Sequence, residues 1–392
     1  MSQEIIVRNP SFYSIKCANP ECSGTSANLK RHGLSRPVSC LWGARRQRFR
    51  CNLCKTTLSD NFFKFHYRLK HKDPAINSKI FRLLVHGLSY RKIAHLLALS
   101  EHCVRIRVNR MAQQAMKFHE QVSKAHKISE PICFDGLENF AASQYEPNNI
   151  QQAVGRDSLF IYDFNFASLN RKGRMSDWQK NRLAEKTDEH GRFNPKAIRV
   201  ATREIIERLV KRRSTQEKPL VFISDEHFQY RRAIEKDLKS KDIEHVTISS
   251  KATRNYQNIL FAINHADLLI RQSMAAFARE TISFSKTAGR MCQKYALFMV
   301  HKNYMSAQFT KTQVRRPRAH LQSPAQSLGL FDRLLEFSDI FSHRSQKQDC
   351  KEWNKDWQCF WSGEVPKPYA RSKKFCSSDF SHSLRRTVNN CK

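Results

Sequence analysis

Apolar residues recur at helical spacing between residues 74 and 122, and three helices are predicted there. The first presents one apolar face and ends at Gly87. Ser89 is in the position of an N-cap for the second helix, and a short break separates this helix from a third that begins at Glu101. The apolar positions are Ile80, Leu83 and Leu84 in the first helix, Ile93, Ala94, Leu96 and Leu97 in the second, and Val104, Ile106, Val108 and Met111 in the third.

The last two of these helices have the layout of a helix-turn-helix, a motif that places its second helix in the major groove of DNA. The third helix is rich in arginine. The residues expected to face DNA are Arg105, Arg107, Asn109 and Arg110. A plain three-helix bundle is the alternative interpretation, because helical hairpins are common in proteins that do not bind DNA.

Beyond about residue 130 the pattern changes to the alternation and short apolar runs that are typical of β-strands. The segment PICFDGLENFAASQY predicts a strand that ends at Asp135, then a turn and a second strand, and DSLFIYDFNFASL predicts a third. A helix is predicted over residues 196–213, a fourth strand in PLVFISDEH, a helix in FQYRRAIEKDLKS, a fifth strand in DIEHVTIS, and a long helix in NILFAINHADLLIRQSMAAFARE. The expected fold class is therefore α/β, with a mixed sheet layered by helices.

Two of the predicted strands end in an aspartate, Asp135 and Asp225. Sites in open α/β sheets assemble at strand ends, so both side chains could point into one crevice. Paired carboxylates suit Mg²⁺ or Mn²⁺, and such ions activate water or a 3′-hydroxyl at a phosphodiester. A third ligand is expected from the long helix, which offers Asn264 and Asp267, or from Glu280. The alternative is that strand-end aspartates only form turns or cap helices, as Asp225 would by capping the next helix.

The excess of positive charge in the chain indicates what kind of partner it binds. The chain has 69 Lys and Arg residues against 35 Asp and Glu residues, a formal net charge of +34. Such an excess is typical of proteins that bind nucleic acid, and a generally basic surface is the alternative. With 392 residues and 40% apolar content, the chain can form two or three folded units.

Neither a membrane span nor a signal peptide is predicted. Apolar runs fall short of the roughly 18 residues that a span requires, and the opening MSQEIIVRNPSFYS lacks the charged-then-apolar layout of a signal peptide. We therefore expect a cytoplasmic, nucleoid-associated protein. Its 12 cysteines are then expected to be thiols or metal ligands rather than disulfides.

The cysteine spacing near the N-terminus predicts a zinc ribbon. Cys17 and Cys22 form one close pair (CANPEC), and Cys51 and Cys54 form another (CNLC). Two such pairs, separated by a few tens of residues, suit one tetrahedral Zn²⁺ bound by four thiolates. Coincidental clustering in a cysteine-rich chain is the alternative.

These motifs together resemble bacterial insertion-sequence transposases of the DDE type, which combine a zinc ribbon, a helix-turn-helix and an RNase H-like catalytic domain. The likeness is carried, in order, by CANPEC, FRCNLCKTTLSD, GLSYRKIAHLLALSEHCVRIRVNRMA, FDGLENF, YDFNFASLNRKGRM, ISDEHFQYRRAI and NHADLLIRQSMAAFARETISFSK. It implies a zinc ribbon over residues 1–65, a helix-turn-helix over 74–122, an RNase H-like mixed-sheet catalytic domain over 128–304 and a basic C-terminal extension over 305–392.

The resemblance implies a transposase that binds terminal inverted repeats and performs Mg²⁺-dependent strand cleavage and strand transfer, acting as a homo-oligomer on double-stranded DNA. By position, Asp135 and Asp225 match the first two catalytic aspartates of the family. The family's third acid is a glutamate whose counterpart here is Asn264, so Asp267 is the expected third ligand and Glu280 the fallback. The alternatives are a non-catalytic DNA-binding regulator, an inactive transposase remnant and an RNA-processing nuclease.

Overall fold

The computed structural model describes most of the chain between residues 17 and 341. The described residues are 17, 19, 21–34, 47–59, 75–190, 192–214, 218–238, 242–278, 281–308 and 321–341. Glu280, and the part of the predicted C-terminal extension that follows residue 341, lie outside them.

Three short antiparallel strands form a small sheet in the N-terminal part of the chain. β1 (Leu29–Leu34) pairs with β2 (Gln47–Cys51), and β2 pairs with β3 (Thr57–Ser59). The turn between β2 and β3 carries the second cysteine of the CNLC motif, Cys54. A strand leading into this motif is what the sequence predicts.

The three helices predicted from the apolar spacing are present. They are α1 (Ile76–Val85), α2 (Tyr90–Leu96) and α3 (Glu101–Ala125). The hydroxyls of Ser89 and Ser100 accept hydrogen bonds from backbone N–H groups in the first turns of α2 and α3, so both residues are N-caps. Gly87 ends α1 with a φ of +96°, a conformation that favours glycine. One inner-face prediction is wrong, because Leu96 is 61% exposed.

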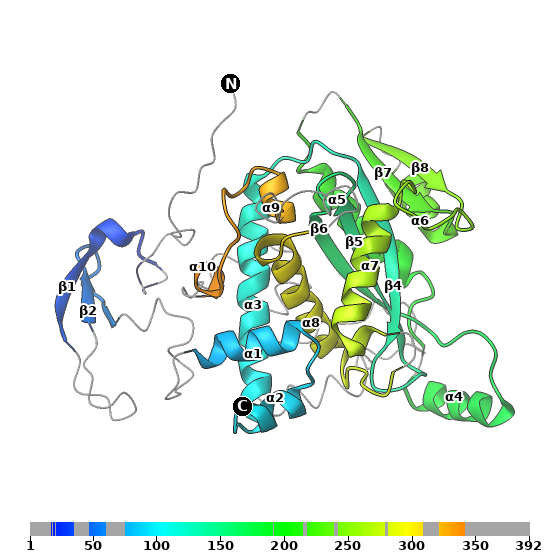
Figure 1. Cartoon of the computed structure of the whole chain (residues 1–392), viewed down its shortest axis with the longest axis horizontal. Coiled ribbons are helices and arrows are strands. Elements are labelled where there is room, and N and C mark those ends of the chain that lie inside the picture. The colour runs from blue at the N-terminus through cyan, green and yellow to red at the C-terminus, as the bar shows by residue number, and fades with distance from the viewer. Residues whose placement is uncertain are drawn as a thin grey trace.

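A five-stranded mixed sheet forms the centre of the molecule (Figure 1). Its strands are β4 (Ile132–Phe140), β5 (Pro147–Gly155), β6 (Ile161–Ser168), β7 (Leu220–Asp225) and β8 (Ile243–Ile248). Their order is β6-β5-β4-β7-β8; β4, β5 and β6 are successively antiparallel, whereas β7 runs parallel to β4 and to β8. The mixed sheet is confirmed, but the strand predicted to end at Asp135 continues to Phe140, because β5 pairs with its whole length.

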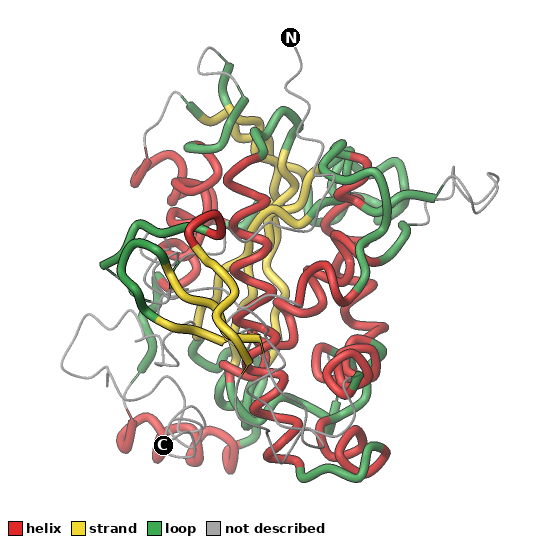
Figure 2. The backbone as a smooth tube through the Cα atoms, turned by 90° about the vertical axis from the view of Figure 1, so that its left-hand side faces the viewer, coloured by secondary structure: helices red, strands yellow, loops and turns green. Residues whose placement is uncertain are grey.

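Helices cover both faces of this sheet (Figures 1 and 2). The helices after α3 are α4 (Asp177–His190), α5 (Ala197–Val210), α6 (Phe228–Arg232), α7 (Phe261–Ser273), α8 (Ala288–Val300), α9 (Pro324–Ser327) and α10 (Phe337–Phe341). Neighbouring residues of β5 show the two layers, since Gln151 bonds to α5 and Gln152 to α7 on the opposite face. No described helix is long and apolar enough to span a membrane.

A single hydrophobic core connects the predicted helix-turn-helix to the sheet. Buried residues of α1 and α3 belong to the same cluster as those of the sheet, α7 and α8. Residues 321–341 join it too: the side-chain amide of Gln114 in α3 donates to the carbonyl oxygen of Ile340 at 3.1 Å, and the Phe81 and Phe341 rings lie 5.2 Å apart. Residues 321–341, which belong to the predicted C-terminal extension, are thus packed against α1 and α3.

Candidate active site and cysteine cluster

The register between β4 and β7 brings two of the predicted aspartates together. Ile132 is paired with Phe222, and Phe134 with Ser224, in a parallel ladder. One further step in the same register places Asp135 beside Asp225, the last residue of β7. Because side chains alternate along neighbouring strands in phase, both carboxylates lie on the same face of the sheet.

Helix α7 covers this face and brings the third aspartate. It packs on β4 and β5, and the side-chain amide of Gln152 in β5 donates a hydrogen bond to Asp267 Oδ1 at 2.5 Å. Gln152 is also the cross-strand partner of Asp135. Asp267 is therefore held above the strand pair that carries Asp135.

The electrostatics of Asp135 show that the three carboxylates interact. Burial, and then the negative charges of Asp267 and Asp225, raise the pKa of Asp135 to about 7. The backbone N–H of Gly136, which donates to Asp135 Oδ1 at 2.6 Å, and the positive charge of Arg254 act in the opposite direction. Close carboxylates whose charges repel one another are the setting in which a bound cation is stabilising.

The three aspartates do not form a compact ligand set. Among the described residues, the four N-terminal cysteines are the one group of three or more His, Cys, Asp or Glu side chains whose ligand atoms all lie within 4.8 Å of one another. Asn264, the other candidate on α7, lies one turn before Asp267 and is partly buried. Glu280 falls outside the described residues.

Asp225 does not cap the helix that follows it, which was the alternative interpretation of its position. The N-cap of α6 is His227, with no side-chain cap bond. Asp225 Oδ1 instead accepts the backbone N–H of His227 at 3.0 Å, which turns the chain away from the sheet. Buried Tyr230 of α6 packs edge-on against Phe134, 5.0 Å between ring centroids, and burial raises its pKa well above the usual value.

The four predicted zinc ligands lie together at the small sheet. The sulfur atoms of Cys17 and Cys54 are 3.2 Å apart, and those of Cys22 and Cys51 are 3.8 Å apart. A Cβ at Gly24 would lie 2.9 Å from the Cys51 sulfur, so the absence of a side chain at Gly24 leaves room for the cluster. Burial raises the pKa of the Cys17 thiol to about 12, an effect that a cation bound to the thiolate would oppose. This arrangement is compatible with a zinc site.

The predicted DNA-facing residues of α3 are not all on its surface. Arg107 is 2% exposed; its guanidinium donates to the Asn77 side-chain oxygen of α1 at 2.8 Å and to the Cys103 sulfur at 3.2 Å. Asn109 accepts a hydrogen bond from Gln293 of α8 at 3.1 Å. The prediction that Arg107 faces DNA is therefore wrong, and Asn109, although partly exposed, is bonded to α8. Arg105 and Arg110 remain partly exposed.

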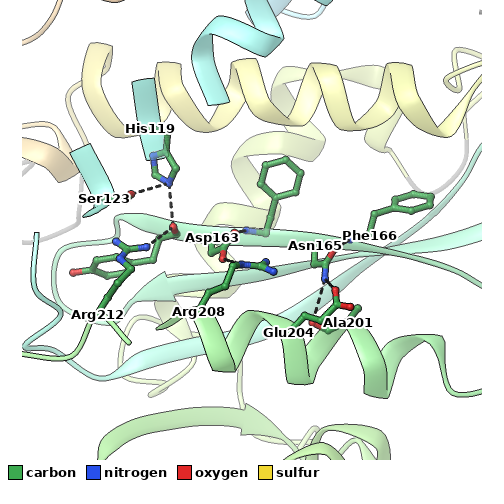
Figure 3. Close-up of polar contacts among 11 residues, drawn as sticks. His119, Ser123, Asp163, Asn165, Phe166, Ala201, Glu204, Arg208 and Arg212 are labelled. Atoms are coloured by element: carbon green, nitrogen blue, oxygen red, sulfur yellow. Dashed lines mark hydrogen bonds and ion pairs between the residues drawn. The ribbon is translucent and has the colours of Figure 1, made fainter. Parts of the chain in front are cut away.

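A polar network that sequence reasoning missed connects α3, β6 and α5 (Figure 3). The ring of His119 in α3 bonds to the carbonyl oxygen of Tyr162 at 3.0 Å, and burial lowers the pKa of His119 to about 4. On the other face of β6, Arg208 of α5 forms a 2.6 Å ion pair with Asp163. The Asn165 side-chain amide donates to Glu204 of α5 at 2.9 Å.

Gln152 is the site residue that sequence reasoning missed. A signal was present, since β5 reads PNNIQQAVG and holds four amide side chains in an interior strand.

Neither a scan against protein-family models nor a search of curated proteins finds a match to this chain.

Proposed function

We propose that the protein is a metal-dependent DNA transposase of the DDE type that cleaves and joins phosphodiester bonds. The observation that carries this proposal is the register that sets Asp135 beside Asp225 on the sheet face covered by α7 and its Asp267. Three successive antiparallel strands followed by two parallel ones also suit the RNase H-like domain that the sequence resemblance implies. The net charge of +34 suits a polyanionic substrate.

The donor set fits a hard divalent cation in its chemistry. Asp135, Asp225 and Asp267 offer oxygen ligands from three different elements. Burial raises the pKa of Asp135 most, and repulsion from Asp267 and Asp225, which a cation would offset, raises it further. Bound Mg²⁺ or Mn²⁺ would supply Lewis acidity at the phosphodiester. The ligand atoms of the three aspartates do not all lie within 4.8 Å of one another, so the three carboxylates would have to move closer together around a bound ion.

In this proposal, the aspartates hold the metal ion and basic residues contact the DNA. Asp135 and Asp225 are fixed by strand pairing, and both carboxylates also accept backbone N–H groups. Arg254 lies close enough to Asp135 to lower its pKa, and therefore places a positive charge near the aspartates. Arg105 and Arg110, which are partly exposed, would contact duplex DNA, and the four cysteines would hold a structural Zn²⁺. A homo-oligomer on DNA in the nucleoid remains part of the proposal.

The test is cleavage and joining of a duplex that carries the DNA flanking the protein's own gene, in Mg²⁺ or Mn²⁺. Asp135→Asn and Asp225→Asn should each lower the rate by at least about a hundredfold while leaving duplex affinity within about threefold. Asp157→Asn is the control, because Asp157 is an exposed acid paired with Arg156. Cleavage at the wild-type rate by both site variants would overturn the assignment.

A non-catalytic DNA-binding regulator is the second candidate, and the failure of the three carboxylates to form a compact ligand set favours it. The same observation favours an inactive transposase remnant, in which Asn264 occupies the position of the family's glutamate. Either would leave the DNA uncut in the wild-type protein as well as in every acid variant, and would bind the duplex with wild-type affinity throughout.

A further inference from the structure

We infer that Gln152 and Tyr295 form a positioning relay that fixes the orientation of Asp267, an inference that rests on the proposed function. Tyr295 of α8 donates its hydroxyl hydrogen to Gln152 Oε1 at 2.5 Å, and Gln152 Nε2 donates to Asp267 Oδ1 at 2.5 Å. The two bonds form one chain from α8 through β5 to α7.

The direction of this chain is set by Tyr295. Its side chain is fully buried, and burial, together with the charges of Asp267 and Asp163, raises its pKa well above the usual value. The hydroxyl therefore stays protonated and acts as a donor. The oxygen of the Gln152 amide must face Tyr295 to accept this hydrogen, and the NH₂ group then faces Asp267.

Packing leaves the relay little freedom. Gln152 is 0% exposed, and its backbone is held by ladder pairing with Asp135 on one side and Phe164 on the other. The Tyr295 ring packs against the Phe164 ring, 4.4 Å between centroids. A side chain anchored in this way fixes the position of one carboxylate oxygen of Asp267.

An amide is the group that this position requires. It is neutral, so it adds no fourth negative charge beside Asp135, Asp225 and Asp267. It also accepts and donates at once, which neither a carboxylate nor an aliphatic side chain can do here. A residue that orients a metal-ligating carboxylate through a hydrogen bond typically changes metal affinity by about 10–100-fold when removed.

Gln151 provides a matched control. It is the next residue of β5, is also 0% exposed, and makes equivalent bonds on the opposite face: its amide donates to the Ile198 carbonyl at 2.9 Å and accepts from the Thr202 hydroxyl at 3.3 Å. Gln151→Leu and Gln152→Leu therefore remove the same buried group from the same strand, and only the second touches the aspartates.

The experiment titrates the full-length protein with Mn²⁺, detected by electron paramagnetic resonance, and compares the Mg²⁺ concentration that gives half-maximal DNA cleavage. Gln152→Leu should weaken Mn²⁺ binding and raise this Mg²⁺ concentration by about tenfold or more, and Gln151→Leu by less than about twofold. Tyr295→Phe removes a single hydroxyl, should weaken Mn²⁺ binding by about threefold or more, and keeps the test decisive if Gln152→Leu does not fold.

Equal Mn²⁺ affinity in the Gln151, Gln152 and Tyr295 variants, with a wild type that binds Mn²⁺ and cleaves DNA, would overturn the relay and leave the proposed function standing. A wild type that binds no Mn²⁺ would overturn both.

Discussion

Arg107 matches the sequence pattern of a DNA-contacting residue, but in the structure its side chain is buried in the core. It lies in the arginine-rich stretch of the third helix and was expected to face DNA. In the structure its planar guanidinium instead bridges α3 to α1 through Asn77, with a second bond to Cys103 one turn away. The helical period alone does not distinguish buried Arg107 from partly exposed Arg105, because arginine is rarely fully buried and both are expected at the surface.

Arg107→Ala should lower the free energy of unfolding by about 2–4 kcal/mol, because it leaves Asn77 without this partner and opens space in the core. Arg105→Ala should change it by less than about 0.5 kcal/mol and weaken duplex binding instead. Chemical denaturation and fluorescence anisotropy with a labelled duplex measure the two quantities. Unchanged stability in Arg107→Ala would contradict the buried bridge.

The acidic residues of the candidate site could be predicted from the sequence, but the residues that hold them in place could not. Asp135 and Asp225 were found because an acid after an apolar run is a local pattern, and Asp267 because the helix offers few acids. Gln152 and Tyr295 become site residues through the pairing of β5 with β4 and the packing of α8. The contact between Gln152 and Tyr295 joins residues 143 apart in the chain, and no local spacing encodes it.

At the scale of elements, β6 and α5 are joined by an ion pair that lies mostly out of water. The Arg208 and Asp163 side chains are 20% and 11% exposed, and their atoms approach to 2.6 Å. Arg182 and Glu185 on α4 approach to the same distance but are 53% and 62% exposed. The two pairs have the same closest N–O distance in different surroundings, so their comparison tests the effect of burial.

Asp163→Asn should lower the free energy of unfolding by about 2–4 kcal/mol, because it leaves the Arg208 charge unpaired in a buried position. Glu185→Gln should cost less than about 0.5 kcal/mol, since water solvates an exposed arginine without help. Denaturant melts of the two variants give the comparison. Similar losses in both would mean that the Asp163–Arg208 pair is solvated like a surface pair.

The small sheet depends on its cysteines more than on its core. Its strands are 6, 5 and 3 residues long, and Leu58, Cys17 and Cys51 are its buried apolar side chains among the described residues. So little apolar surface is not expected to fold such a unit without a further linkage.

Purified wild-type protein should contain about one Zn²⁺ per chain, and Cys51→Ser should contain far less, because three thiolates and a hydroxyl hold Zn²⁺ poorly. Inductively coupled plasma mass spectrometry gives the stoichiometry. Cys103→Ser is the control, since Cys103 lies in α3 and contacts Arg107. Zinc retained at the wild-type level in Cys51→Ser would exclude the cluster as its site.

At the scale of the whole molecule, the type of each helix or strand could be predicted from the sequence more readily than its length or the elements on which it packs. The sheet, α1 to α3, α5 and α7 follow from periodicity and capping residues such as Ser89. The length of β4 beyond Asp135 depends on a partner strand, so the sequence around Asp135 did not encode it. Exposed α4 lacks an apolar face, and no helix was predicted there. The shared core between helices and sheet reflects long-range packing in the same way.

Helix α3 sets a fixed distance within the molecule. Its 25 residues span about 37 Å without interruption. Arg105 lies in its second turn, whereas His119 near the other end is bonded to the backbone of β6. Under the proposed function, a duplex that contacts Arg105 and reaches the aspartates would bridge two sites whose spacing α3 helps to set. One residue inserted into α3 between Arg105 and His119 would rotate the part of the helix that carries Arg105 by about 100° relative to the sheet, and such a duplex could no longer contact both sites in the same way.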